Sequence, residues 1–150
     1  MKLHDCLSCL IEGGKPARMA SDPVLFLARL HMAWLFFVSG RQKLLDWDAT
    51  LYLFQYEYKL PFLPPDVAAY SGTFFELVMP VLLAFGFLTR LAALPLIVMS
   101  ATIQFVLGAT NPDYNNPQHI LWILVLALIA TQGAGRWSVD HFLRKRLMNQ

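Results

Sequence analysis

Residues 65–108 read PDVAAYSGTFFELVMPVLLAFGFLTRLAALPLIVMSATIQFVLG, and this stretch decides the fold. It contains two apolar runs, residues 65–88 and 91–108, and each approaches the roughly 20 residues that a membrane-spanning helix needs. The turn between the runs is confined to GFLTR at residues 86–90. Such a short connection forces the two helices into an antiparallel hairpin.

Two more apolar runs flank this hairpin, at residues 23–45 and 117–131. Pro23 and Pro117 suit the first turn of a helix, and Asp22 and Asn116 precede them as natural caps. The sequence therefore predicts an all-α fold, a membrane four-helix bundle. We expect a cytoplasmic N-terminal arm at 1–22, a membrane domain at 23–135 and a basic C-terminal helix at 136–150.

The composition supports a membrane protein over a soluble one. The chain has 150 residues, of which 57% are hydrophobic and 15% charged. Soluble domains carry about 25% charged residues. These values argue against a nucleic-acid binder, a disordered chain and an ordinary cytosolic enzyme, and they make the lipid bilayer the expected partner.

The basic residues predict the orientation, because cytoplasmic loops are enriched in Lys and Arg. With four spans, both termini and the turn at Arg90 share one side. That side holds Lys2, Lys15, Arg18, Arg90, Arg136, Arg144, Lys145 and Arg146. The opposite side holds only Arg41, Lys43 and Lys59. We expect a multi-pass protein of the bacterial inner membrane with both termini in the cytoplasm.

The outer connection, residues 46–64, is rich in aromatic residues. Trp47, Leu51, Phe54 and Tyr58 recur at helical spacing, which predicts an amphipathic helix in the membrane interface between spans one and two. A lone strand there would leave its backbone unpaired. The helix is either an aromatic anchor or a lid over a lipid-soluble ligand.

Ionisable and polar residues also fall inside the predicted spans, where each needs a partner or a function. Glu76 lies near the middle of span two, and span one offers Arg29 and Lys43 on a single stripe. Spans three and four add Gln104, His119 and Trp122. These groups either satisfy one another or form a site for a quinone headgroup, its protons or a polar solute.

Two features at the ends of the chain add further predictions. Cys6 and Cys9 form a single CxxC, which is either a pair of reduced thiols or part of a metal site. Ser138 is a plausible N-cap for the C-terminal helix, whose basic residues would lie on the anionic inner leaflet. No haem or iron–sulfur ligand set is visible.

Several motifs together resemble the DoxX family of small four-helix membrane proteins. Arg29 and the segment FVSGRQKL at 37–44 resemble its Arg…Gly-x-x-Lys-Leu helix, and Leu60-Pro61 precedes span two. Glu76, Gly86 and Arg90 resemble its Glu…Gly-x-x-x-Arg hairpin. His119 and GAGRWSVD at 133–140, which includes Ser138 and Asp140, resemble its closing motif. The Cys6/Cys9 arm lies outside the pattern.

The resemblance implies the fold more strongly than the reaction. The family takes its name from a subunit of an archaeal thiosulfate:quinone oxidoreductase. This implies a membrane subunit that passes electrons from sulfur or thiol donors to quinone, with Glu76 and His119 handling protons and a partner chain supplying the redox centre. Arg90, Ser138 and Asp140 are expected to be structural.

Two other classes of function remain open. The chain could be a non-enzymatic scaffold or chaperone for a partner protein in a membrane complex, or part of a homo-oligomer. It could also carry a small solute or metal, with Cys6 and Cys9 as a cytoplasmic acceptor.

Overall fold

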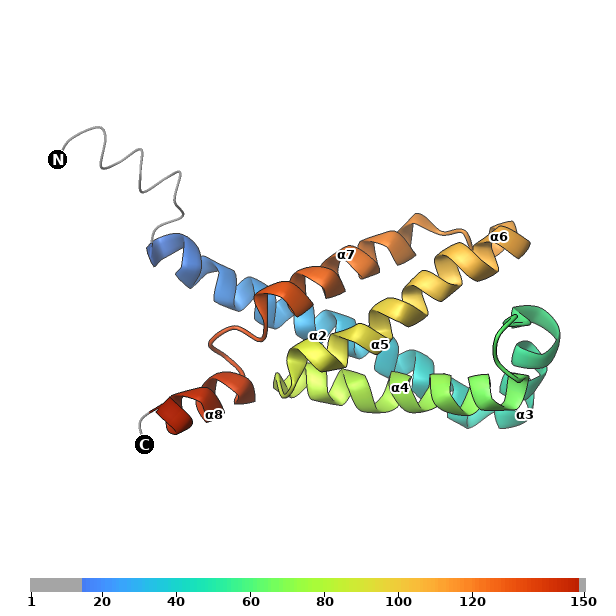
Figure 1. Cartoon of the computed structure of the whole chain (residues 1–150), viewed down its shortest axis with the longest axis horizontal. Helices are drawn as coiled ribbons and strands as arrows, with labels where there is room; N and C mark the ends of the chain where they lie inside the picture. Colours follow the sequence, from blue (N-terminus) through green and yellow to red (C-terminus); the bar gives the residue numbers. More distant parts are fainter. Residues whose placement is uncertain (1–14, 149–150) are drawn as a thin grey trace.

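A computed structural model describes residues 15–148, with side chains from residue 21 onward, and the described part contains helices and no strands. The elements are α2 Lys15–Leu45, α3 Trp47–Tyr52, η1 Leu53–Tyr58, α4 Pro65–Phe85, α5 Thr89–Ala101, η2 Thr102–Leu107, α6 Gly108–Thr110, η3 Pro112–Tyr114, α7 Pro117–Gln132 and α8 Val139–Met148. Helices α2 and α4 and the continuous helical stretch Thr89–Thr110 are long, α7 is shorter, and small helices lie at their ends (Figure 1).

Three stretches of helix in the described part are long and apolar enough to cross a membrane. They are Ser21–Leu45, Pro65–Phe85 and Thr89–Thr110. The fourth predicted span, α7, has 16 residues, which at 1.5 Å per residue is about 24 Å against a hydrocarbon core of about 30 Å. The prediction of multiple apolar spans is thus confirmed for three helices.

The predicted start of the first helix at Pro23 is wrong, because α2 begins at Lys15 and Pro23 lies inside it. Proline removes one backbone donor, and α2 continues through it. Asp22 therefore does not cap the start of a helix. Its carboxylate instead accepts a hydrogen bond from the backbone N–H of Arg136, at 3.0 Å. At α7 the prediction is correct, since the Asn116 side chain accepts from Gln118 N.

The main core is drawn from α2, α4, α5 and α7. Its buried members are Met32, Ala33, Phe36, Leu83, Ala93, Leu96, Leu126 and Ile129. The turn at Gly86 reverses the chain between α4 and α5, as the short connection predicted. Many large apolar side chains outside this core are exposed, which suits helices surrounded by lipid.

The connection between α2 and α4 is helical, as the spacing predicted, with α3 followed by the π-helical η1. Its apolar face packs on the start of α4, where Phe54 meets the buried Ala68 and Ala69. Trp47, Leu51 and Tyr58 pack against the same cluster. The predicted apolar face is therefore the face that contacts the protein.

Candidate functional site

A cavity of about 770 Å³ lies between α4, α5 and the connection that precedes α4. Most of its wall is apolar, with contributions from α4, α5, η1 and η2. The polar exceptions are Ser39, Lys43, Tyr58, Ser71, Glu76, Thr102 and Tyr114. Ligand sites of about 300–1,000 Å³ with a few placed polar groups are typical of small-molecule binding.

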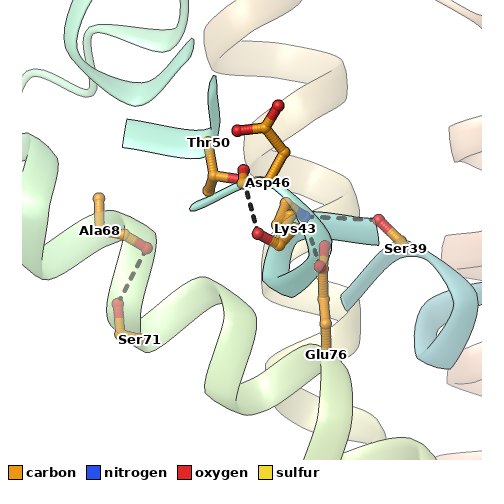
Figure 2. Close-up of polar contacts among 7 residues, drawn as sticks. All are labelled: Ser39, Lys43, Asp46, Thr50, Ala68, Ser71 and Glu76. Atoms are coloured by element: carbon orange, nitrogen blue, oxygen red, sulfur yellow. Dashed lines mark hydrogen bonds and ion pairs between the residues drawn. The ribbon is translucent and has the colours of Figure 1, made fainter. Parts of the chain in front are cut away.

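An ion pair between Lys43 of α2 and Glu76 of α4 forms the charged part of this wall (Figure 2). Lys43 Nζ donates to Glu76 Oε2 and, at 3.4 Å, to Ser39 Oγ. The Glu76 side chain is 4% exposed and that of Lys43 18%. A buried charge pair stabilises little by itself, but removal of one partner strands the other charge in an apolar setting.

Gly40 allows the two helices to approach closely enough for this pair. A Cβ at position 40 would lie 2.9 Å from the Glu76 Cβ and 3.1 Å from Leu77 Cγ. Lys43 is one helical turn beyond Gly40 on the same buried stripe. The small residue therefore sets the helix separation that brings Lys43 to Glu76.

The end of α2 is tied to α3 by Thr50, just beside the ion pair (Figure 2). The Thr50 hydroxyl lies 2.9 Å from the carbonyl oxygen of Lys43 and 3.0 Å from that of Asp46. The Asp46 carboxylate accepts from Ala49 N and caps α3. The segment that covers the cavity is thus anchored at the residue that carries the cation.

The other margin of the cavity is closed by two tyrosines. Tyr58 and Tyr114 meet edge to face with ring centroids 5.6 Å apart, and Tyr114 Oη donates to Glu57 Oε2 at 2.7 Å. Burial raises the pKa of Tyr58, and the Glu57 and Glu76 carboxylates add to that shift. Burial, followed by the hydrogen bond to Glu57, raises the pKa of Tyr114 to about 12. Both phenols are therefore protonated hydrogen-bond donors near neutral pH.

The structure does not bring the other predicted ligand residues to Glu76. Gln104, His119 and Trp122 are absent from the cavity wall. Gln104 donates to Asn115 Oδ1 instead. His119 packs edge to face on Trp122, which in turn contacts Phe36 at a centroid distance of 5.9 Å.

Arg29 lies away from Glu76, where it secures the turn between α4 and α5. It is fully buried, and it donates to the carbonyl oxygen of Trp137 at 2.6 Å and to that of Leu83 at 3.5 Å. Its guanidinium also lies 5.6 Å from the Phe26 ring centroid. A Cβ at Gly86 would overlap Arg29 Nη1, so position 86 needs glycine for space as well as for its φ of +68°.

The residues expected to be structural lie at this same end. Asp140 accepts from the backbone N–H groups of Leu88 and Thr89, at 2.9 and 3.1 Å, across the start of α5. Ser138 Oγ accepts from His141 N in the first turn of α8. Arg90 donates to the carbonyl oxygen of Thr131 at 3.3 Å. The segment after α7 is thereby bound to the hairpin turn.

A metal site is not visible in residues 15–148, where no three His, Cys, Asp or Glu side chains are grouped suitably. The metal prediction for Cys6 and Cys9 lies outside the described residues. Reasoning from the sequence placed Tyr58 on a helix that was a possible lid over a ligand, and it did not identify Tyr114. Sequence spacing does not indicate that Tyr58 and Tyr114 lie close together, because they are more than 50 residues apart in the chain.

Comparison with known proteins agrees with the arrangement of these motifs. The DoxX family model matches residues 24–109, which include Gly40, Lys43, Glu76 and Gly86. A Haemophilus influenzae protein described as uncharacterized is 30% identical over 145 residues, covering 91% of each chain. No solved structure matches the chain. The chain therefore belongs to the DoxX family and is a multi-pass membrane protein.

Proposed function

We propose that this protein binds the headgroup of a membrane quinone in the cavity beside Lys43 and Glu76, as the membrane subunit of a quinone-linked oxidoreductase system. The observation that carries the proposal is a largely apolar cavity of about 770 Å³ with one buried ion pair on its wall. A quinone has a flat apolar ring and two carbonyl oxygens. Lys43 and Tyr58 offer donors for those oxygens, whereas the single O–H of Tyr114 is already donated to Glu57. The apolar wall suits the ring.

The cavity is also placed for entry from the membrane. Its lining side chains on α5 include Leu91, Leu94 and Val98, which are 61%, 52% and 63% exposed on the outside of the helices. A lipid-soluble ligand could enter between α4 and α5 without crossing water. This favours a quinone over a polar solute, because few polar groups line the cavity.

The proposed membrane frame follows from the distribution of charge. α2, α4, the helix Thr89–Thr110 and α7 form a four-helix bundle in the bacterial inner membrane, with both termini in the cytoplasm. Residues 23–135 are its membrane domain. The α3–η1 segment then lies in the outer interface and covers the outer part of the cavity.

Reduction of a quinone takes up two electrons and two protons. The proposed donors are two thiols on a partner subunit, which become a disulfide and release two protons as the quinol forms. Within this chain Lys43 holds a proton at Nζ, and Glu76 accepts its hydrogen bond. The pair is placed to orient the headgroup and pass a proton to its oxygen.

The test is binding of a short-chain ubiquinone to the full-length protein in lipid nanodiscs. Glu76→Gln is expected to weaken binding about tenfold, the equivalent of 1.4 kcal/mol. Asp66→Asn is the matched control, since Asp66 is an exposed carboxylate on the same helix and is absent from the cavity wall. It should bind as the unmodified protein does.

A second variant separates binding from folding. Lys43→Met with Glu76→Met replaces the ion pair by apolar side chains of similar length, a change that is often neutral for stability. This variant should fold and bind quinone weakly. Unmodified protein that binds no quinone overturns the proposal, and a co-purifying partner insensitive to Glu76→Gln would then favour the scaffold function.

A further inference from the structure

A second cavity, of about 750 Å³, lies at the opposite end of the molecule from α3, where α8 approaches the start of α5. In contrast to the first cavity, its wall is rich in charged and polar groups. Its basic side chains are Arg90, Arg136 and Arg144, accompanied by His141, and its acidic ones are Asp22 and Asp140. The functional proposal above uses none of these residues.

The two carboxylates are already engaged by backbone donors. Asp140 accepts from Leu88 N and Thr89 N, and Asp22 accepts from Arg136 N. Asp22 also lies 3.7 Å from Arg136 Nε, although that arginine side chain is 67% exposed. Backbone donors therefore satisfy both carboxylates, and the three arginines exceed the two aspartates of the wall by one positive charge.

Two of the arginines retain donors for such an anion. Arg90 makes one hydrogen bond, through Nη2 to the carbonyl oxygen of Thr131, and a guanidinium has five N–H donors. Within the described residues Arg144 forms no side-chain hydrogen bond or ion pair, and it is exposed. Arginine is the residue best suited to bidentate contact with phosphate oxygens.

The apolar part of the wall indicates the source of the phosphate. Leu88 and Leu91 line the cavity and are 47% and 61% exposed. Leu94 and Val98 continue the same exposed surface along α5, a helix that is apolar enough to cross a membrane. A phosphate held by the arginines would thus have an apolar path beside it for acyl chains.

We propose that this cavity binds the headgroup of an anionic phospholipid, with Arg90 and Arg144 contacting the phosphate and the acyl chains lying along α5. Asp140 positions the site, since it joins α8 to the first residues of α5. The inference rests on the membrane character of the chain, and the acyl-chain path along Leu91, Leu94 and Val98 runs beside the proposed entrance of the quinone cavity.

The experiment measures phospholipid retention by the full-length protein, using native mass spectrometry after exchange into phosphatidylglycerol or phosphatidylcholine. The unmodified protein should retain phosphatidylglycerol in preference. Arg90→Gln with Arg144→Gln should reduce that retention about thirtyfold, because each basic residue near anionic lipid contributes a factor of about five.

The matched control is Lys145→Gln with Arg146→Gln. Lys145 and Arg146 lie on α8 beside Arg144, but they are absent from the cavity wall. Their substitution removes two positive charges, as the Arg90 and Arg144 substitutions do. Their replacement should change retention less than about twofold. An equal loss in both double variants would show diffuse attraction to the membrane surface and would overturn the proposal.

Two further arms separate the remaining outcomes. Arg90→Lys with Arg144→Lys keeps the charge but loses the bidentate contacts, so its retention of phosphatidylglycerol should fall between those of the unmodified protein and the Gln variant. Millimolar inorganic phosphate is added in the last arm. If it binds at this site and displaces the lipid, the ligand is a free phosphate and the lipid proposal fails.

Discussion

Gly40 of α2 lies so close to Glu76 of α4 that a methyl group at position 40 would reach within 2.9 Å of the Glu76 Cβ. This contact places the helix carrying Lys43 beside the carboxylate and so creates the ion pair on the cavity wall. Helix separation and site chemistry are therefore set by one residue. The first prediction tests that connection.

Gly40→Ala is expected to push α2 and α4 apart and to destabilise the protein by about 1–3 kcal/mol, the usual cost of overpacking a core. Gly72→Ala is the control, since a Cβ there would meet Phe54 Cζ at 3.5 Å, an ordinary contact. The free energy of unfolding of each variant is measured in mixed micelles. Equal stability of the two variants would contradict the close approach at Gly40.

Breaking the ion pair on one side should cost more than replacing both partners. Lys43→Met alone leaves Glu76 in an apolar setting and is expected to destabilise by about 3–5 kcal/mol, whereas the double replacement with Glu76→Met should be near neutral. A double-mutant cycle on the free energy of unfolding measures the coupling. Additive effects would show that the two side chains do not interact.

Gly86→Ala is expected to be strongly destabilising, for two reasons that act together. The residue has a φ of +68°, and its Cβ would overlap the Arg29 guanidinium that binds the Trp137 carbonyl. Release of Arg29 should free the segment after α7, which limited proteolysis would detect as faster cleavage near Arg136. Cleavage at the rate of the unmodified protein would argue against this contact.

Asp140→Asn should weaken the attachment of α8 to the hairpin. The carboxylate accepts two backbone N–H groups at the start of α5, and an amide offers only one acceptor oxygen. The expected loss is about 1 kcal/mol, as for removal of a helix cap. Hydrogen exchange at Leu88 and Thr89 should accelerate. Asp48→Asn, at an exposed position in α3, should leave that exchange unchanged.

The Tyr114 contact predicts a stability change at high pH. The pKa of Tyr114 is raised in the folded protein from 10.0 to about 12, by burial and then by the hydrogen bond to Glu57. A raised pKa means that its stabilising contribution is complete below pH 10 and is lost as the pH rises from about 10 to about 12. Thermal unfolding across this window measures the loss.

Tyr114→Phe is expected to reduce the part of the stability loss that is due to Tyr114, and to loosen the margin of the cavity that Tyr58 and Tyr114 close. Tyr56→Phe serves as the control, because Tyr56 is 53% exposed and does not line the cavity. If both variants lose stability in the same way as the unmodified protein between pH 10 and 12, the Glu57–Tyr114 contact has no measurable role.

Local pattern was sufficient for much of the helical architecture. Apolar runs of suitable length predicted the helices, and the short GFLTR segment predicted the hairpin. The spacing of Trp47, Leu51, Phe54 and Tyr58 predicted an amphipathic helix, and the structure shows that these four side chains pack against the protein. The start of α2 was not predictable from Pro23 and Asp22. A proline is compatible with the first turn of a helix and also with an interior position where one backbone hydrogen bond is missing. The sequence does not show that the Asp22 carboxylate binds the backbone N–H of Arg136 instead of capping a helix.

The sequence by itself determined that the chain is helical, apolar and dependent on a few buried polar groups, because those properties follow from composition and from a period along one chain. Only the tertiary structure decided that Lys43, and not Arg29, pairs with Glu76, and that His119 and Gln104 lie outside the cavity. Periodicity gives the angle of a side chain around its own helix. The separation and relative height of two helices depend on contacts such as Gly40 with Glu76, which join residues 36 positions apart.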